Sequence, residues 1–378
     1  MSIDSPRFIL FAALALALPA SALAETPPVP PQTTSPQPAQ QPTAPHAAAI
    51  CPLPSRAGEK LVRKNVPEAH VAMPDYADLA TVPVAAELSG SIRRVELPPG
   101  KKLVALTFDL CETPNEVAGY DGEIVETLRA EHVPATFFSG GHWAVTHAAR
   151  FGEMAADGSF EIGNHTWTHA NLRLADPDKL KREILAPIAA FAEVAGRSTC
   201  HRPDAAADAP MPRPRLFRFP FGACNPATMK AVNDAGMLAI QWDVATDDAS
   251  PFRSADMIVK DTLPHVRPGS IILAHANGRG YHTGSALPRL IRELKRRGYE
   301  FVTVSELLAA GRPVIAASCY DERPGDTDKY DTWGLHKAAA LPKPQPPAAI
   351  PIKLPAAVDT RPPAAPRPIE PGLNGRIN

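Results

Sequence analysis

The sequence lacks an excess of charge of either sign. Its 39 Lys and Arg residues are balanced by 40 Asp and Glu residues, which leaves a net charge of −1. Proteins that bind nucleic acid or an acidic polymer through their overall charge carry a clear basic excess. The composition gives no support to such partners, and we expect no nucleic-acid partner. Hydrophobic residues make up 44% of the chain, enough for a sizeable core in one or two domains.

The apolar run at the N-terminus lacks the length to span a bilayer. It extends from Phe8 to Ala20, whereas a transmembrane helix needs about 20 apolar residues. Arg7 precedes the run, and Ser21–Ala24 supplies small residues two apart, the pattern that a signal peptidase reads. We therefore predict a signal peptide over residues 1–24. Export would follow to an oxidising compartment, periplasmic or extracellular, with no stable membrane span after cleavage.

Proline, in contrast, is plentiful, and its 44 residues are unevenly distributed. Residues 25–57 consist mainly of Pro, Gln, Thr and Ala, and residues 341–378 are also rich in Pro. Such segments bury too little apolar surface to offset their ordering entropy, so both are predicted to be disordered. We expect an irregular lead-in over 58–101, a folded domain over 102–313 and a C-terminal extension over 314–340.

Within the folded domain, strand-like runs alternate with helix-like runs. Repeated βα units predict a parallel sheet with right-handed crossovers. About seven units over roughly 210 residues favour an α/β fold of the distorted (β/α) barrel type, with about seven parallel strands. The predicted strands are 103–108, 135–138, 160–163, 215–219, 237–243, 270–274 and 301–304. The predicted helices are 117–131, 144–157, 176–195, 226–235, 254–263, 285–298 and 305–310.

Residues at the C-terminal ends of these strands are the candidates for an active site, because α/β folds place their sites there. Asp109 ends the first apolar run, and His165 and His169 follow the third. Two His residues four apart suit one metal ion if they lie on one turn of helix. Arg218 lies inside a predicted strand, where its burial is costly unless a carboxylate pairs with it.

Two further candidates stand at later strand ends. Asp248 belongs to an acidic cluster after residue 243, and His275 directly follows a very apolar strand. Each candidate has an ordinary alternative: a loop cap, unrelated imidazoles, an exposed Arg, a solvated acidic cluster or a core histidine. The candidates gain weight only as a set, because the predicted fold brings their strand ends to one edge of the sheet.

Taken in order, these residues resemble the five motifs of polysaccharide deacetylases, the NodB-homology domains of carbohydrate esterase family 4. The motifs are Thr-Phe-Asp ending at Asp109, His-x-x-x-His from His165, Arg-x-Pro-x-Gly from Arg218, Asp248 near a Trp, and Leu-x-His ending at His275. Each motif is short, but five in this order at strand ends are specific. The resemblance covers residues 102 to about 310.

The resemblance implies a metal-dependent hydrolase that removes acetyl groups from an N-acetylated glycan of the envelope or the extracellular space. His165 and His169 would hold a divalent metal ion, expected to be Zn²⁺. Asp109 would be the general base, His275 the general acid that protonates the leaving amine, and Arg218 the group that holds Asp109. The glycan would be the substrate partner, and the oligomeric state is not predicted.

Further roles follow from the same resemblance. Asp248 would orient or tune the acid His275. The backbone N–H near Phe221 would complete an oxyanion site, and Gly222 and Leu273 would lie beside the substrate.

The chain departs from the family pattern at the third metal ligand. The family has a second Asp directly after the base, but here that position is Leu110, which cannot bind a metal. We expect Glu112 to replace it, since a strand returns a side chain to the same face after two residues. The alternative is that Glu112 only caps the turn that follows. Cys111 is the rival ligand and is expected to point to the other face. Phe221 stands where the family usually has Tyr.

Five cysteines leave at least one unpaired in an exported chain. Cys111 is the expected free thiol because it lies in the loop of the candidate site. The other four allow three pairings, of which we expect Cys51 with Cys319 and Cys200 with Cys224.

Two functions from different classes remain open at this point. One is the deacetylase. The other is a catalytically weak carbohydrate-binding or scaffold protein on the same fold, favoured by the incomplete metal triad. The metal content of the purified protein separates the two.

Overall fold

The structure is a computed structural model that describes residues 53–66, 70–200 and 211–332. The predicted signal peptide, most of the predicted linker and the predicted Pro-rich tail lie outside the described residues. Among the helices described, none has the length and apolarity needed to cross a membrane.

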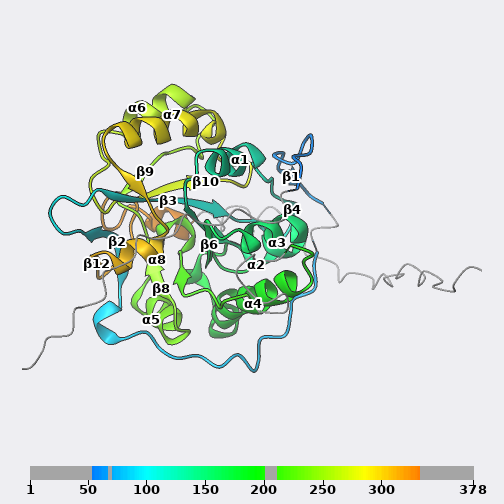
Figure 1. Cartoon of the computed structure of the whole chain (residues 1–378). Helices are drawn as coiled ribbons and strands as arrows, with labels where there is room; N and C mark the ends of the chain where they lie inside the picture. Colours follow the sequence, from blue (N-terminus) through cyan, green and yellow to red (C-terminus); the bar gives the residue numbers. More distant parts are fainter. Residues whose placement is uncertain (1–52, 67–69, 201–210, 333–378) are drawn as a thin grey trace, which may run out of the picture. The chain divides into compact units, whose positions relative to one another are not determined.

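A curled, mostly parallel β-sheet organises the described part of the chain (Figure 1). Its strands are β2 (Ser91–Glu96), β3 (Leu103–Leu110), β5 (Ala135–Ser139), β6 (Phe160–Asn164), β7 (Leu216–Phe217), β8 (Leu238–Ile240), β9 (Val244–Ala245), β10 (Ile271–His275), β11 (Glu300–Phe301) and β12 (Arg312–Ala316). They lie in the order β12-β2-β8-β7-β6-β5-β3-β10-β9, with β11 beside β3. Neighbours run parallel except β12 and β2.

The sheet curls toward closure between β8 and β9. β8 pairs with β2 and β7, and the chain then continues into β9, which pairs with β10. Between them, the amide of Gln241 donates to the carbonyl of Ile92 and that of Asp243 donates to Ile271. One stretch of chain thus joins the two sides of the sheet. The predicted distorted (β/α) barrel is confirmed.

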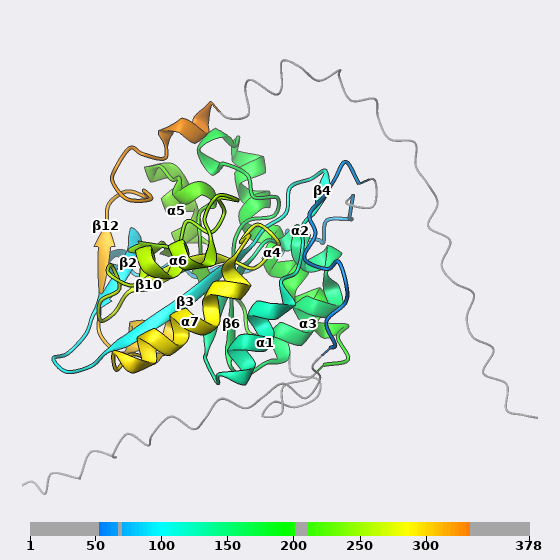
Figure 2. The same cartoon turned by 90° about the horizontal axis from the view of Figure 1, so that it is seen from above.

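Helices cover the outside of the sheet and follow the predicted order. They are α1 (Gly122–Ala130), α2 (Gly141–Thr146), α3 (Ala148–Ala156), α4 (Pro177–Gly196), α5 (Pro226–Asp234), α6 (Ala255–Thr262), α7 (Thr283–Arg296) and α8 (Val304–Ala309). Figure 1 shows α6, α7 and α1 above β3 and β10, with α4 and α5 on the opposite side. α7 packs against both α1 and α6 (Figure 2). The predicted helix 144–157 is two helices, because His147 between them has non-helical backbone angles.

The start of α4 shows how local sequence sets an element. The side chain of Asp176 accepts a hydrogen bond from the Lys179 amide at 2.8 Å, and Pro177 occupies the first helical position. The cap satisfies an amide that has no partner inside the helix, and Pro sacrifices no hydrogen bond there.

Two strands lie outside the expected domain limits. β2 falls in the lead-in predicted to be irregular, and β12 crosses the predicted boundary at residue 313. They pair with each other antiparallel, across more than 200 residues of sequence. β2 carries Arg93 and Arg94 in its middle, which interrupt the apolar run that signals a buried strand. The expectation of an irregular lead-in is therefore wrong over 91–96.

The disulfide pattern also differs from the expected one. Cys224 is bonded to Cys319, across 95 residues, so both expected pairings that include these residues are wrong. The reason lies in the topology: β12 runs beside β2 and brings the chain after it close to the loop that follows β7. Cys200 is also disulfide-bonded, and Cys51 lies outside the described residues. Cys111 is a free, buried thiol as expected.

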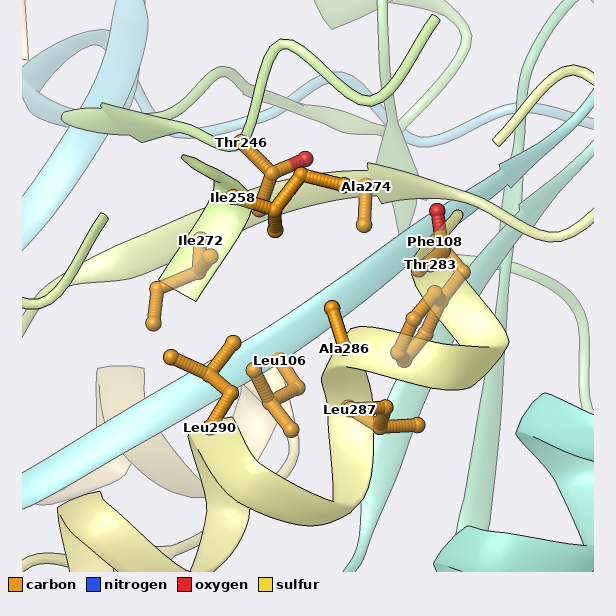
Figure 3. A pocket seen from close by; sticks show the side chains of 10 residues that line it. All are labelled: Leu106, Phe108, Thr246, Ile258, Ile272, Ala274, Thr283, Ala286, Leu287 and Leu290. Atoms are coloured by element: carbon orange, nitrogen blue, oxygen red, sulfur yellow. The ribbon is translucent and has the colours of Figure 1, made fainter. Parts of the chain in front are cut away.

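A small apolar cavity lies between the sheet and two helices (Figure 3). Its volume is about 10 Å³, close to the minimum for a single water, so it cannot be a substrate site. Side chains of α7 face it, among them Leu287 and Leu290, opposite Leu106 and Phe108 of β3. The cavity is a packing gap under α7.

Replacement of Leu287 with Ala should enlarge this gap. Leu287 is 2% exposed, and Leu→Ala changes at buried sites cost about 2–5 kcal/mol in free energy of unfolding. Denaturant unfolding measures the loss. The matched change Leu61→Ala, at a side chain 67% exposed, should stay within about 0.5 kcal/mol of the parent. Equal losses in the two variants would contradict this account of the α7 packing.

Candidate active site

A buried ion pair lies at the C-terminal end of the central strands. Asp109 is the seventh residue of β3, and Arg218 directly follows β7. The guanidinium of Arg218 is 0% exposed and donates to Oδ1 of Asp109 at 2.8 Å. Burial alone would raise the pKa of Asp109, but the charge and hydrogen bond of the Arg218 guanidinium hold that pKa below its usual value. The predicted pairing of Arg218 with a carboxylate is confirmed.

Two imidazoles converge beside this pair. Nε2 of His165 lies 3.4 Å from Oδ2 of Asp109, and the ring centroids of His165 and His169 are 4.9 Å apart. They do not lie on one turn of helix. They follow β6 in a loop where Thr166 and His169 both have left-handed backbone angles, with φ of 70° and 54°. The expected helical turn is wrong, and a loop brings the two rings together.

The ring of His165 is oriented for ligation. Its Nδ1 lies 2.8 Å from the carbonyl oxygen of Arg218, which can only accept, so Nδ1 carries the proton. Its Nε2 is buried and has no hydrogen-bond partner in the part of the chain that the structure describes. Burial lowers the pKa of both His165 and His169. Both rings therefore stay neutral, as a metal ligand must be.

Cys111 completes a three-donor group. The Cys111 sulfur, one ring nitrogen of His165 and one ring nitrogen of His169 all lie within 4.8 Å of one another. A sulfur and two imidazole nitrogens form a donor set that zinc takes. Burial raises the pKa of the Cys111 thiol, and a bound cation would reverse this by favouring the thiolate. These residues fit a divalent metal.

Glu112 is directed to a different cluster. Its Oε1 lies 2.6 Å from Nδ1 of His142 and accepts from the Thr146 hydroxyl, and its Oε2 accepts from the Ala118 amide. The expectation that Glu112 joins the two His residues is wrong, and so is the expectation that Cys111 points away. β3 ends at Leu110, so the two-residue alternation of a strand does not extend to the next two positions.

Asn277 supports Cys111 and was not predicted. Its fully buried Nδ2 donates to the carbonyl oxygen of Cys111 at 2.7 Å and lies 3.2 Å from the sulfur. A donor at the sulfur favours its charged form. The available signal was position, since Asn277 stands two residues after His275 at the same sheet edge.

His275 and Asp248 form a second pair at this edge. His275 is in register with Asp109 on the neighbouring strand. Its Nδ1 lies 2.8 Å from Oδ1 of Asp248, whose Oδ2 accepts from the His275 amide at 2.7 Å. The hydroxyl of Thr283 also donates to Oδ2. Burial lowers the pKa of His275, but the Asp248 carboxylate outweighs it and the pKa is raised overall.

The predicted oxyanion residues form a tight turn over the imidazoles. Phe221 lies in a short 3-10 turn with φ of 61° and ψ of 9°, and its ring centroid is 4.6 Å from that of His169. Gly222 also has positive φ, and a Cβ there would meet the Trp242 ring at 3.0 Å. Leu273 shares its strand face with His275 and packs on an apolar cluster that includes Trp242.

The arrangement can therefore combine several functions within one edge of the sheet. An ionised carboxylate and a three-donor metal group lie together, and a histidine with a raised pKa stands on the adjacent strand. Such groups could provide a general base and a general acid beside a bound cation.

Comparison with known proteins gives consistent relatives. Residues 96–240 match the family model for polysaccharide deacetylase. The chain is 31% identical over 217 residues to a peptidoglycan-N-acetylglucosamine deacetylase of Bacillus cereus. The aligned region covers 56% of this chain and 91% of that protein. The chain is also 32% identical over 224 residues to a chitooligosaccharide deacetylase of a Bradyrhizobium species. That alignment covers 55% of this chain and 91% of the relative.

A solved structure of a peptidoglycan N-acetylglucosamine deacetylase is also similar. The TM-score is 0.50 at 28% sequence identity, over 60% of this chain and 96% of that one.

The raised pKa of His275 predicts a titration that depends on Asp248. In Asp248→Asn, the pKa of His275 followed by NMR should fall toward or below its usual value of about 6.5. Because the folded pKa is raised, the pair stabilises the fold fully below the unfolded pKa and loses that contribution as pH rises through the folded pKa. The difference in free energy of unfolding between parent and variant should therefore decrease as the pH rises.

The control for this titration is Asp243→Asn. Asp243 accepts from the Arg267 side chain and the Ile271 amide rather than from His275, so the titration of His275 should be unchanged. An unaltered His275 pKa in Asp248→Asn would show that Asp248 does not set it.

Proposed function

The chain belongs to the polysaccharide deacetylase family, and we propose that it is a metal-dependent hydrolase removing acetyl groups from an N-acetylated envelope or extracellular glycan. The observation that carries the proposal is the convergence of Asp109, His165 and Arg218 at one point, with the Asp248–His275 pair in register beside it. Binding alone does not need an acid and a base so arranged.

Cys111, His165 and His169 would hold the divalent ion, for which we propose Zn²⁺. When bound, such an ion acts as a Lewis acid toward the acetyl carbonyl and makes water more acidic. Support comes from the donor set and from the buried Nε2 of His165, which has no hydrogen-bond partner among the described residues. Asn277 would keep the Cys111 sulfur in place.

Asp109 is proposed as the general base. Arg218 holds its Oδ1, so Oδ2, on the side of the imidazoles, is the oxygen that takes a proton from the attacking water. The depressed pKa keeps the carboxylate ionised before the reaction. The same ion pair prevents the carboxylate from rotating, which keeps Oδ2 oriented.

His275 is proposed as the general acid. Its Nδ1 is engaged by Asp248, so Nε2 is the atom that delivers a proton to the leaving amine. The raised pKa favours the protonated ring. The amide of Phe221 would stabilise the negative charge on the acetyl oxygen, with Gly222 and Leu273 bordering the substrate.

The substrate and location are also proposals. The relatives are named for peptidoglycan N-acetylglucosamine and for chitooligosaccharides, so we propose a glycan with N-acetylated sugars and no nucleic-acid partner. An exported protein is supported by the Cys224–Cys319 disulfide, which persists in oxidising compartments.

A catalytically weak carbohydrate-binding or scaffold protein is the alternative. Leu110 favours it, because the position of the family's third ligand is a core residue here, 1% exposed. Stoichiometric metal in the purified protein supports the enzyme, and its absence supports the binder.

Acetate release tests the activity. Chitooligosaccharides, peptidoglycan fragments and acetylated xylan, followed by mass spectrometry, should show acetyl loss from at least one N-acetylated substrate. Asp109→Asn and His275→Ala should each lower kcat by about 100-fold to 10,000-fold, the usual contribution of a positioned acid or base. Asp243→Asn is the matched control and should retain parental turnover. Parental rates in either site variant would overturn its assigned role.

Metal affinity tests the ligand set. His165→Ala and His169→Ala should abolish zinc binding measured by competition with a chelator. Cys111→Ser should weaken it by more than about 100-fold, while Glu112→Gln, acting only through the loop, should weaken it by about tenfold at most. A larger loss in Glu112→Gln than in Cys111→Ser would return the ligand role to Glu112.

A further inference from the structure

A segment beyond the family-matched region crosses the candidate site. Residues 317–332, here called the C-terminal strap, follow β12 and end in a short 3-10 turn, Asp328–Asp331. In Figure 2 this segment, drawn in orange, leaves β12 and runs past α5. The family model matches residues 96–240, so the strap lies outside the matched residues.

The first half of the strap is fixed near the Phe221 turn. Cys319 is bonded to Cys224, two residues after Gly222. The indole Nε1 of Trp242 donates to Oδ1 of Asp321 at 2.9 Å. A covalent bond and a buried indole donor thus hold this half of the strap against the turn.

The second half is fixed beside the His169 loop. Arg173 donates to the carbonyl oxygen of Thr327 at 2.8 Å and pairs with Asp328 and Asp331, both at 2.8 Å. The side-chain amide of Asn171, two residues after His169, donates to Asp331 at 2.8 Å. The strap therefore bridges the two loops that carry Phe221 and His169.

Aromatic rings connect the strap to the metal group. The ring of Tyr330 stacks on Phe221, with centroids 4.9 Å apart and planes at 27°. Phe221 in turn presents its ring at 65° to His169, 4.6 Å away, and His169 lies against His165. Phe221 is thus held between Tyr330 and a proposed metal ligand.

The backbone of Phe221 needs such support. Its φ of 61° is in the left-handed region, where a bulky residue is a genuine outlier. Strained backbone of this kind persists only where the surroundings over-determine it, and it clusters at active sites. Tyr330 on one side and His169 on the other supply that constraint.

We propose that Tyr330 is a positioning residue, which holds Phe221 in its left-handed turn and thereby places both the Phe221 amide and the His169 imidazole. The inference rests on the proposed function. The extension that follows β12 is then a structural part of the active site rather than an appendage.

Tyr330→Ala tests this in the full-length protein. It should weaken zinc affinity about tenfold and lower kcat about tenfold, the range for residues that support a metal ligand, with a smaller change in KM. Tyr330→Phe keeps the ring and should restore both values to within about twofold. The matched control is Tyr320→Ala, on the same strap, whose ring packs over Arg93 rather than Phe221. If Tyr330→Ala behaves like Tyr320→Ala in both measurements, the proposal is overturned.

A double-mutant cycle tests the route through Phe221. Glycine adopts positive φ without strain, so in a Phe221→Gly background the loss of Tyr330 should have little further effect on kcat or zinc affinity. A full, additive loss in that background would show that Tyr330 does not act through Phe221.

Zinc affinity keeps the two proposals separable. If the parent protein releases no acetate from any substrate offered, the proposed function fails. The zinc titrations of Tyr330→Ala, Tyr330→Phe and Tyr320→Ala still decide whether the strap positions His169.

Discussion

The ion pair between Asp109 and Arg218 is the constraint on which the site depends. A fully buried guanidinium is tolerated only when its donors are satisfied, and here Asp109 and the carbonyl groups of Ile240 and Gln241 satisfy them. The backbone carbonyl of Arg218 also accepts a hydrogen bond from the His165 ring and so fixes its orientation. One buried side chain and its backbone therefore orient both the carboxylate and the first imidazole.

In the proposed ligand set, the donor next to this pair lies one residue later than the position expected from the family resemblance. Leu110 completes β3 as a core residue, and the chain then leaves the strand so that Cys111 faces the imidazoles. Glu112 anchors the new path of the loop through His142 and Thr146, and Asn277 fixes the Cys111 carbonyl and sulfur. In that proposed set a softer sulfur would take the place of a hard carboxylate, and hydrogen bonds hold the loop after β3 on both sides.

The additions at both ends of the domain complete the fold and the site. β2 and β12 extend the sheet, the Cys224–Cys319 disulfide joins the extension to the loop after β7, and the strap reaches Phe221. The family model matches residues 96–240, and the strap lies outside them. A segment outside residues 96–240 thus contributes contacts to the candidate site.

The sequence alone determined the repeated βα units, the barrel class, the helix start at Asp176 and the residues Asp109, His165, His169, Arg218 and His275, because periodicity, caps and strand ends are local signals. Only the tertiary structure decided that Cys111 rather than Glu112 faces the imidazoles, that β2 pairs with β12, that Cys224 pairs with Cys319, and that Tyr330 lies on Phe221. Each of these depends on where a strand ends or on which distant segments meet. Such contacts are selected by the packing of the whole chain, which no short stretch of sequence encodes.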